Sequence, residues 1–193
     1  MTSTSVSPER VARDRLSGFD LLDECHRDTV VVLAKLDTLV ERLGRAGADA
    51  EAKALAADVV RHFTTVMPKH HKDEERDVFP PLAAGGDPQI VQDVLRLQQD
   101  HHWLDIDWKE LSPHVNAIAS GMAWNDFELL REGVEIFTAL LHEHMALEES
   151  VIYPEARARL LDGARLENRR LATAQRRAER AQRKAVHTPA QPG

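Results

Sequence analysis

Two segments of the chain repeat the same order of chemically active residues. In residues 70–80 a histidine is followed by glutamates at the fourth and fifth positions and then by Phe-Pro, and residues 144–154 repeat this order with Tyr-Pro. Residues four apart on an α-helix lie about 40° apart and roughly 6 Å along the axis, so one helix can direct a nitrogen and an oxygen to the same metal ion. The two pairs are His70 with Glu74 and His144 with Glu148. The repeat therefore predicts a pseudo-twofold site for two metal ions.

The same residues interrupt stripes of apolar side chains that follow the helical period. His26 and His101 interrupt the stripes of two further segments, 22–43 and 90–111, so each of four helical segments sends a polar group into the predicted core. A buried glutamate without a partner costs several kcal/mol, and no lysine or arginine lies on these stripes within a turn of the glutamates. A metal cation is then the expected partner. The predicted metal ligands are His26, His70, Glu74, His101, His144 and Glu148.

Other histidines and carboxylates lie beside the predicted ligands. Four of them stand one residue off a stripe, where they support a ligand or face solvent, with direct metal binding as the alternative: His71, His102, Glu75 and Glu149. We expect His62 and His142 at the flank of the core or along a channel, and His114 and His187 at the surface. Cys25 is expected to be a packed thiol. A single core histidine is more often structural than a ligand, so a helical bundle with purely structural histidines stays an alternative.

The elements that must position these residues are helices. Apolar residues recur with the helical period in segments 22–43, 55–78, 90–111 and 127–151, and the short connections between them predict an up-down-up-down four-helix bundle. We expect a short helix at 8–16. Asp87 and Asn125 are expected N-caps, with Pro88 at the first helical position. Pro68 is expected to restart its helix, and Ser112-Pro113 to interrupt the third segment.

Composition narrows the class of protein further. The longest uninterrupted apolar run is 30–34, far short of the roughly 20 residues of a membrane helix, and residues 1–18 hold no apolar stretch, so we expect a cytoplasmic protein without membrane contact. One cysteine excludes an internal disulfide and a thiolate-based metal site. Only 5% of residues are aromatic, which argues against an all-β sandwich.

The net charge of −7 is unevenly distributed. From Glu155 onward ten Lys/Arg stand against four Asp/Glu, so this part carries +6 and the remainder −13. An acidic body disfavours nucleic acid as a partner, while the Arg/Ala-rich end could contact a protein. We expect an N-terminal segment over 1–17, the bundle over 18–160, and a basic helix over 161–193 whose last residues, 187–193, are disordered.

The ligand types restrict the metal. Imidazole and carboxylate without thiolate suit iron, manganese or zinc, and zinc prefers about four ligands in a closed site. Six ligands in two halves fit a pair of six-coordinate ions better. The sequence has no Glu-x-x-His, which argues against the ferritin-type di-iron arrangement.

The pattern resembles the hemerythrin-like family, the HHE cation-binding domain. The resemblance covers about residues 18–160 and rests on His26, on His101 in Asp-His-His, and on the two His-x-x-x-Glu units followed by Phe-Pro and Tyr-Pro. It implies a four-helix bundle that holds a non-haem, oxo-bridged di-iron centre with two iron ions per chain, in preference to zinc or manganese. Members of the family bind or sense oxygen, react with peroxide or nitric oxide, or handle iron.

The resemblance predicts a protein that binds or reacts with O2, H2O2 or NO in oxidative or nitrosative stress. One form of this function is a catalase-like enzyme that acts on peroxide. The alternative is an O2 carrier or sensor without turnover, or an iron storage or delivery protein. The chain departs from the oxygen-carrying members, since Asp105 stands where they have a second histidine on the third helix, and Glu149 where they have aspartate. Fewer histidines leave metal positions open, unless Asp105 or His102 fills one of them, and open positions favour turnover.

Overall fold

The structure is a computed structural model, and it describes residues 7–122 and 126–186. Every regular element in these two ranges is a helix, which confirms the predicted all-α class. The α-helices are α1 (Pro8–Ala46), α2 (Ala50–Arg61), α3 (Met67–Asp77), α4 (Phe79–Ala83), α5 (Pro88–Ser120), α6 (Phe127–Leu147) and α7 (Tyr153–Val186). Two π-helical turns, η1 (His62–Val66) and η2 (Glu148–Ile152), join α2 to α3 and α6 to α7.

The chain forms two compact units. The larger unit is Phe19–Ala156, and the smaller unit combines the residues up to Gly18 with those from Arg157 onward. Within the smaller unit the side-chain amide of Asn168 donates to the Glu9 carboxylate at 3.0 Å. None of the helices in the described ranges has a run of apolar residues sufficient to cross a bilayer.

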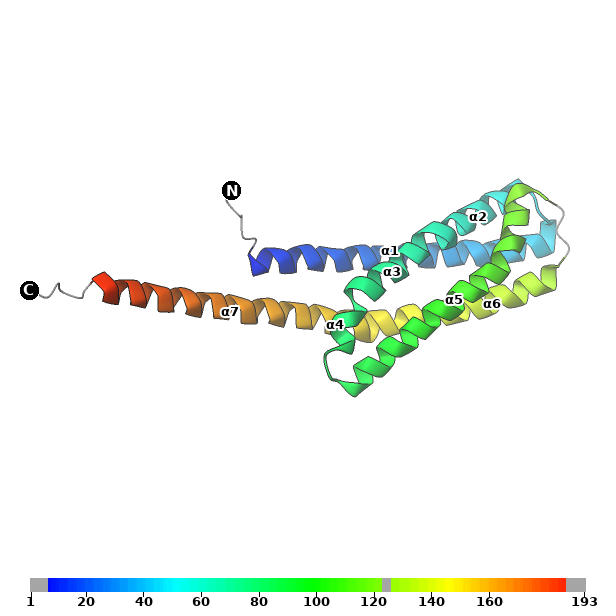
Figure 1. The fold of residues 1–193 in the computed structure, drawn as a ribbon. Coiled ribbons are helices and arrows are strands. Elements are labelled where there is room, and N and C mark those ends of the chain that lie inside the picture. The colour runs from blue at the N-terminus through cyan, green and yellow to red at the C-terminus, as the bar shows by residue number, and fades with distance from the viewer. Residues whose placement is uncertain (1–6, 123–125, 187–193) are drawn as a thin grey trace, which may run out of the picture. The chain divides into compact units, whose positions relative to one another are not determined.

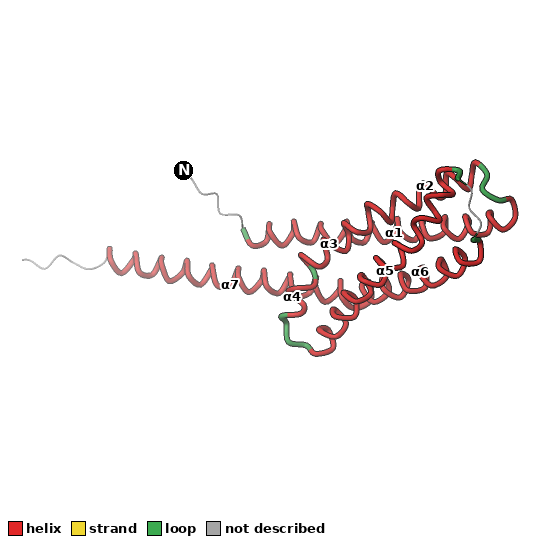
Figure 2. The backbone as a smooth tube through the Cα atoms, turned by 45° about the vertical axis from the view of Figure 1, so that its right-hand side comes forward, coloured by secondary structure: helices red, strands yellow, loops and turns green. Residues whose placement is uncertain are grey.

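The larger unit is a helical bundle built around one apolar core. α2 and α5 run alongside each other, as do α5 and α6 (Figures 1 and 2). The part of α1 from Phe19 onward contributes Leu33, Leu36 and Leu39, each at most 1% exposed, to the same core. Gly133 of α6 permits a close approach to α5, because a Cβ at this position would lie 2.7 Å from a Leu111 methyl carbon.

Helix ends follow the local signals of the sequence. α1 ends just before Gly47, which has a φ of +71° that favours glycine. The Asp49 side chain accepts from the Ala52 N–H at the start of α2. The predicted cap at Asp87 is confirmed, since its side chain accepts from the Gln89 N–H at the start of α5. The predicted cap Asn125 lies outside the described residues, and α6 begins at Phe127.

Two predicted helix boundaries were wrong. The expected short helix at 8–16 is continuous with α1, and α5 runs through Pro113 without interruption. An interior proline costs about 3 kcal/mol because it lacks an N–H and crowds the preceding turn. Val115 and Ile118, both fully buried, continue the apolar stripe of α5 beyond it. Burying each of these side chains contributes roughly 1.5–3 kcal/mol, which offsets the cost of keeping the helix intact.

Each π turn ends two residues before a proline. The Met67 N–H bonds to the His62 carbonyl in η1, and the Tyr153 N–H bonds to the Glu148 carbonyl in η2, so both turns span five residues. Pro68 and Pro154 then follow in the next helices, in agreement with the expected restart at Pro68. A proline in a regular α-helix meets the carbonyl four residues earlier, and a wider turn relieves that contact.

Replacing Leu36 with alanine is expected to lower the free energy of unfolding by about 2–5 kcal/mol, because it removes a fully buried side chain and leaves a cavity. Urea denaturation followed by circular dichroism measures this. Val31→Ala is the matched control on the same helix, since Val31 is 57% exposed and its change should stay within about 0.5 kcal/mol. Equal losses in the two variants would contradict the assigned core.

Candidate metal centre

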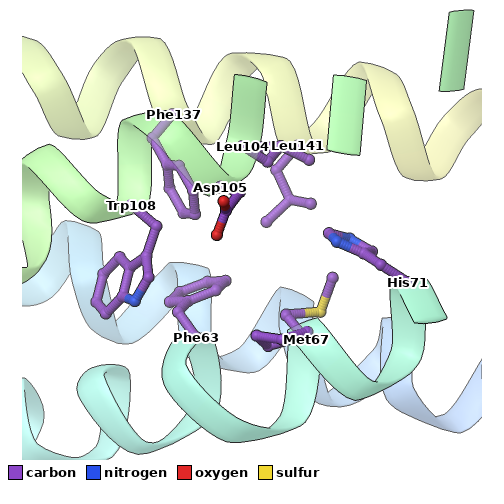
Figure 3. Close-up of a pocket in the computed structure, with 9 residues that line it drawn as sticks. Phe63, Met67, His71, Leu104, Asp105, Trp108, Phe137 and Leu141 are labelled. Atoms are coloured by element: carbon purple, nitrogen blue, oxygen red, sulfur yellow. The ribbon is translucent and has the colours of Figure 1, made fainter. Parts of the chain in front are cut away.

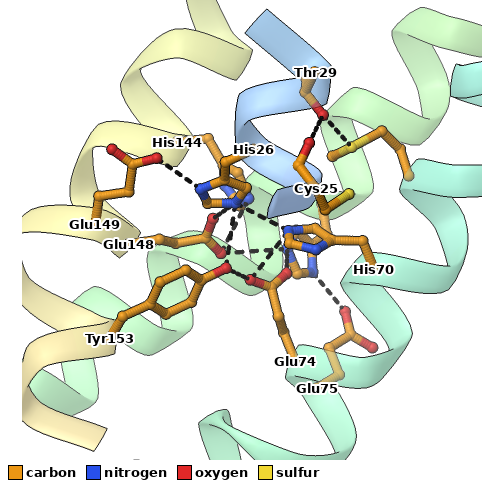
Figure 4. Close-up of polar contacts among 12 residues, drawn as sticks. Cys25, His26, Thr29, His70, Glu74, Glu75, His144, Glu148, Glu149 and Tyr153 are labelled. Carbon is orange, nitrogen blue, oxygen red and sulfur yellow. Dashed lines mark hydrogen bonds and ion pairs between the residues drawn. The ribbon is translucent and has the colours of Figure 1, made fainter. Parts of the chain in front are cut away.

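The structure brings the six predicted ligands together in one buried cluster of the larger unit. Figure 4 labels His26, His70, Glu74, His144 and Glu148 of this cluster. His26 comes from α1, His101 from α5 and His144 from α6. α3 supplies both His70 and Glu74, and Glu148 is the first residue of η2. None of the six is more than 5% exposed.

Glu148 faces both sides of this cluster with separate oxygen atoms. Its Oε2 lies 3.2 Å from Nε2 of His26, and its Oε1 lies 3.2 Å from Nε2 of His144 and 3.9 Å from Nε2 of His101. One carboxylate thus connects histidines on three helices.

Glu74, the glutamate of the other His-x-x-x-Glu pair, has a similar arrangement. Its Oε1 lies 3.3 Å from Nε2 of His70, and its Oε2 lies 3.4 Å from Nε2 of His101. Each glutamate therefore presents one oxygen to each of two positions, as a carboxylate that bridges two cations would.

The cluster divides into two half-sites that share both glutamates. We call His26 and His70 with the two carboxylates the first half-site, and His101 and His144 with the same carboxylates the second. Within each half-site the four potential ligand atoms lie within 4.8 Å of one another. Each set combines two imidazole nitrogens with two carboxylate oxygens, a donor set that suits a divalent transition metal.

Several of these inward-facing atoms have no hydrogen-bond partner among the described residues. They are Glu74 Oε2, both oxygens of Glu148, and the Nε2 atoms of His101 and His144. A buried polar atom without a partner costs about 1–3 kcal/mol, so a group of such atoms pointing at one another needs an explanation. A metal ion at each half-site would satisfy them, and the residues present fit one.

A comparison with family models identifies the fold family. The model of the hemerythrin HHE cation-binding domain matches residues 17–156, which is most of the chain and includes every residue of the cluster. The chain belongs to the hemerythrin HHE cation-binding family. An uncharacterised protein of Haemophilus influenzae is 26% identical over 130 residues, covering 67% of this chain and 73% of the relative.

In this hemerythrin HHE domain, carboxylates outside the cluster hold the outer nitrogens of its histidines. Nδ1 of His26 lies 3.0 Å from Glu149, and Nδ1 of His101 lies 2.9 Å from Glu75. A carboxylate only accepts, so Nδ1 of each ring donates and Nε2 is left with its lone pair toward the cluster. Both glutamates occupy the fifth position of the sequence motif, and each reaches a histidine on another helix.

Two further residues at the cluster were not predicted as part of it. The Tyr153 hydroxyl donates to Glu74 and lies 3.2 Å from Nε2 of His26, and the residue is fully buried. Asp100 is buried on α5 and lies 3.8 Å from Nδ1 of His144. The sequence carried a signal for each, because both belong to the quoted motifs, Tyr-Pro and Asp-His-His.

The other histidines, carboxylates and the cysteine singled out in the sequence differ in how deeply they are buried. His102 and Asp105, considered as additional ligands, are exposed on α5, and Asp105 pairs with Lys109 at 2.5 Å. His62 is buried instead of flanking the core, with Nε2 2.9 Å from the Thr29 hydroxyl. Cys25 is half-buried against the core, and burial raises the pKa of its thiol to about 11, so it is a poor nucleophile.

An apolar pocket of about 50 Å³ lies beside the cluster (Figure 3). His71 and Asp105 line it together with Phe63, Met67, Pro68, Leu104, Trp108, Phe137 and Leu141. Asp105 is 57% exposed, so the pocket reaches the surface of the larger unit. Apolar walls of this kind favour small uncharged molecules over ions.

Burial and mutual charge shift the titration of the cluster strongly. Burial and the nearby charge of Glu148 raise the pKa of Glu74 to about 7. Burial and the charge of His26 lower the pKa of His70 to about 3. Burial alone would lower the pKa of His144, but Glu148 and Asp100 outweigh it and raise this pKa to about 9. Without metal, protons therefore balance part of the charge of the glutamates.

The free energy of unfolding of metal-free protein is expected to fall between pH 7 and pH 9. The stability contributed by His144, whose pKa rises from 6.5 to about 9 on folding, is fully present below pH 6.5 and is lost as pH rises through 9. One pKa unit corresponds to about 1.4 kcal/mol, so the loss should exceed about 1 kcal/mol. Urea unfolding in the presence of a chelator measures it. His144→Gln should flatten the profile, and a rise in stability toward pH 9 would contradict the assignment.

Proposed function

We propose that this hemerythrin HHE domain holds two iron ions in the His/Glu cluster and reacts with small oxidants, namely O2, H2O2 or NO, in the response to oxidative or nitrosative stress. The observation that supports this most is the orientation of Glu74 and Glu148, each of which turns one oxygen to each half-site. We propose as ligands the six residues predicted from the sequence, His26, His70, Glu74, His101, His144 and Glu148.

The proposal also includes the bundle topology that the ligands require. Short connections join α1 to α2 and α4 to α5, and residues 121–126 join α5 to α6. Such connections favour helices that reverse direction in turn, an up-down-up-down order. In that order each helix brings its polar group to the same level of the core.

In this scheme the protein side chains have separate tasks. When bound, the iron ions supply electrons and open coordination positions. Glu74 and Glu148 hold the pair together and balance its charge, while Glu75 and Glu149 fix the ring orientations of His101 and His26. The Tyr153 hydroxyl holds Glu74 in place and keeps a proton within reach of the first half-site.

Burial restricts what can react at this centre. The six proposed ligands are at most 5% exposed, and their surroundings are largely apolar. A small uncharged molecule can enter such a core at low desolvation cost, whereas an anionic or a large substrate cannot. This favours peroxide, dioxygen and nitric oxide as reactants, and peroxide disproportionation to water and dioxygen as the candidate enzymatic form.

Anaerobic titration of metal-free protein with ferrous iron is expected to reach two ions per chain, because there are two half-sites. Exposure to oxygen or to peroxide should then produce the near-ultraviolet charge-transfer absorption of an iron pair. Release of dioxygen after peroxide distinguishes an enzyme from a carrier, and slow loss of iron to a chelator distinguishes both from a storage protein. One ion or none, without these bands, would refute the proposal.

His144→Ala is expected to reduce bound iron to one ion or none per chain, because it removes a proposed ligand of the second half-site. The matched control is His142→Ala on the same helix, where the imidazole is exposed and two ions should remain. Iron content after gel filtration measures both. Equal iron content in the two variants would contradict the ligand assignment.

Glu149→Ala is expected to weaken iron binding by roughly 10–100-fold, the usual effect of losing a carboxylate that orients a ligating histidine. Competition with a chelator of known affinity measures this. Glu135→Ala is the control, since that side chain is 77% exposed and pairs with Arg131 on the surface of the same helix. An unchanged affinity in Glu149→Ala would show that His26 needs no outer support.

A further inference from the structure

Met67 supplies a sulfur atom to the wall of the apolar pocket. Its side chain is only 3% exposed, and Figure 3 shows the thioether turned toward the pocket. A water molecule needs roughly 10–15 Å³ of such space, so a pocket of about 50 Å³ has room for a molecule as small as hydrogen peroxide. Asp105, which is 57% exposed, connects the same pocket to the surface. This buried sulfur therefore has a route to solvent.

The lone pairs of this sulfur are free to react. The Thr29 hydroxyl lies 3.2 Å from the sulfur, but it also lies 2.7 Å from the carbonyl oxygen of Cys25. A hydroxyl has a single hydrogen, and a backbone carbonyl is a much stronger acceptor than a thioether. The hydroxyl therefore donates to the carbonyl, and the sulfur of Met67 keeps its nucleophilic character.

The pocket also contains a polar group that can orient peroxide. His71 follows Met67 by four residues on α3, so the two side chains share a face of the helix, and both line the pocket. Nε2 of His71 is buried and has no hydrogen-bond partner among the described residues. A neutral imidazole nitrogen either donates or accepts, and hydrogen peroxide can do both, whereas O2 and NO have no hydrogen to donate. Peroxide is therefore the oxidant that this pocket suits best.

We propose that Met67 is an oxidation site, at which peroxide in the pocket converts the thioether to a sulfoxide; the inference rests on the proposed function for peroxide as the reactant. One peroxide oxygen bonds to the sulfur as the O–O bond breaks. The sulfur gives up two electrons, and the other oxygen leaves as water with both hydrogens. The product places a polar S–O group among Phe63, Trp108 and Phe137, where it fills the pocket and weakens the packing.

The chain contains matched controls for this reaction. Met145 on α6 is as deeply buried as Met67, at 4% exposure, but it packs in the core without lining the pocket. Met122 is 59% exposed and serves as the freely accessible reference. Burial alone predicts equally slow oxidation of Met67 and Met145, because each would wait for the core to open. A pocket that admits peroxide predicts that Met67 reacts faster.

The test exposes the full chain to hydrogen peroxide, once with iron bound and once with a chelator present. Peptide mass spectrometry at successive times follows the gain of one oxygen atom at each methionine. In both forms Met67 is expected to be oxidised at least about tenfold faster than Met145. Leu104→Phe, which narrows the pocket, should slow the oxidation of Met67 and leave Met122 unchanged, with circular dichroism as the check on folding.

Equal rates for Met67 and Met145 would overturn the inference and leave Met67 as an ordinary core residue. A preference for Met67 that appears only with iron bound would also overturn it, because oxidation would then begin at the cluster and not through the pocket. A chain that binds no iron pair, yet oxidises Met67 first in the presence of chelator, would support the inference and refute the proposed function.

Discussion

The structure depends on balancing two negative charges in an apolar core. Glu74 and Glu148 are fully buried, and no lysine or arginine is buried among the described residues. An uncompensated buried carboxylate is costly enough to consume much of the stability of a small domain. Four histidines from four helices surround these carboxylates, so the helices meet where the charge is, and the apolar core packs around that meeting point.

The two glutamates of each Glu-Glu pair have different roles at the cluster. The first glutamate of each pair faces inward between the half-sites. The second leaves the cluster and holds a histidine of another helix, so that Glu75 connects α3 to α5 and Glu149 connects η2 to α1. Ligand geometry and helix packing are thus coupled, since a shift of either helix would disturb both.

The sequence predicted the helical class and the grouping of six residues, because breaks in an apolar stripe are visible in a regular period. It misplaced residues wherever the period changes. The apolar stripe predicted for segment 55–78 includes Val66, but Val66 is 40% exposed and Met67 is buried in its place, because η1 widens the helix by one residue. η2 likewise buries Ile152 and Tyr153 in place of Val151. His71 stands one residue beside the stripe and still lies against His101 and His144, because a ring can reach the cluster from beside the stripe.

The two π turns also bear on whether the metal-binding residues take up their positions before or after an ion binds. Pro68 and Pro154 disfavour a return to the tighter α-helical turn, because each ring would then meet the carbonyl four residues before it. The register that carries His70 and Tyr153 toward the cluster is therefore fixed by the covalent chain rather than induced by a cation. Preorganisation of this kind removes an entropic penalty from metal capture and allows an apo protein to present its ligands in place.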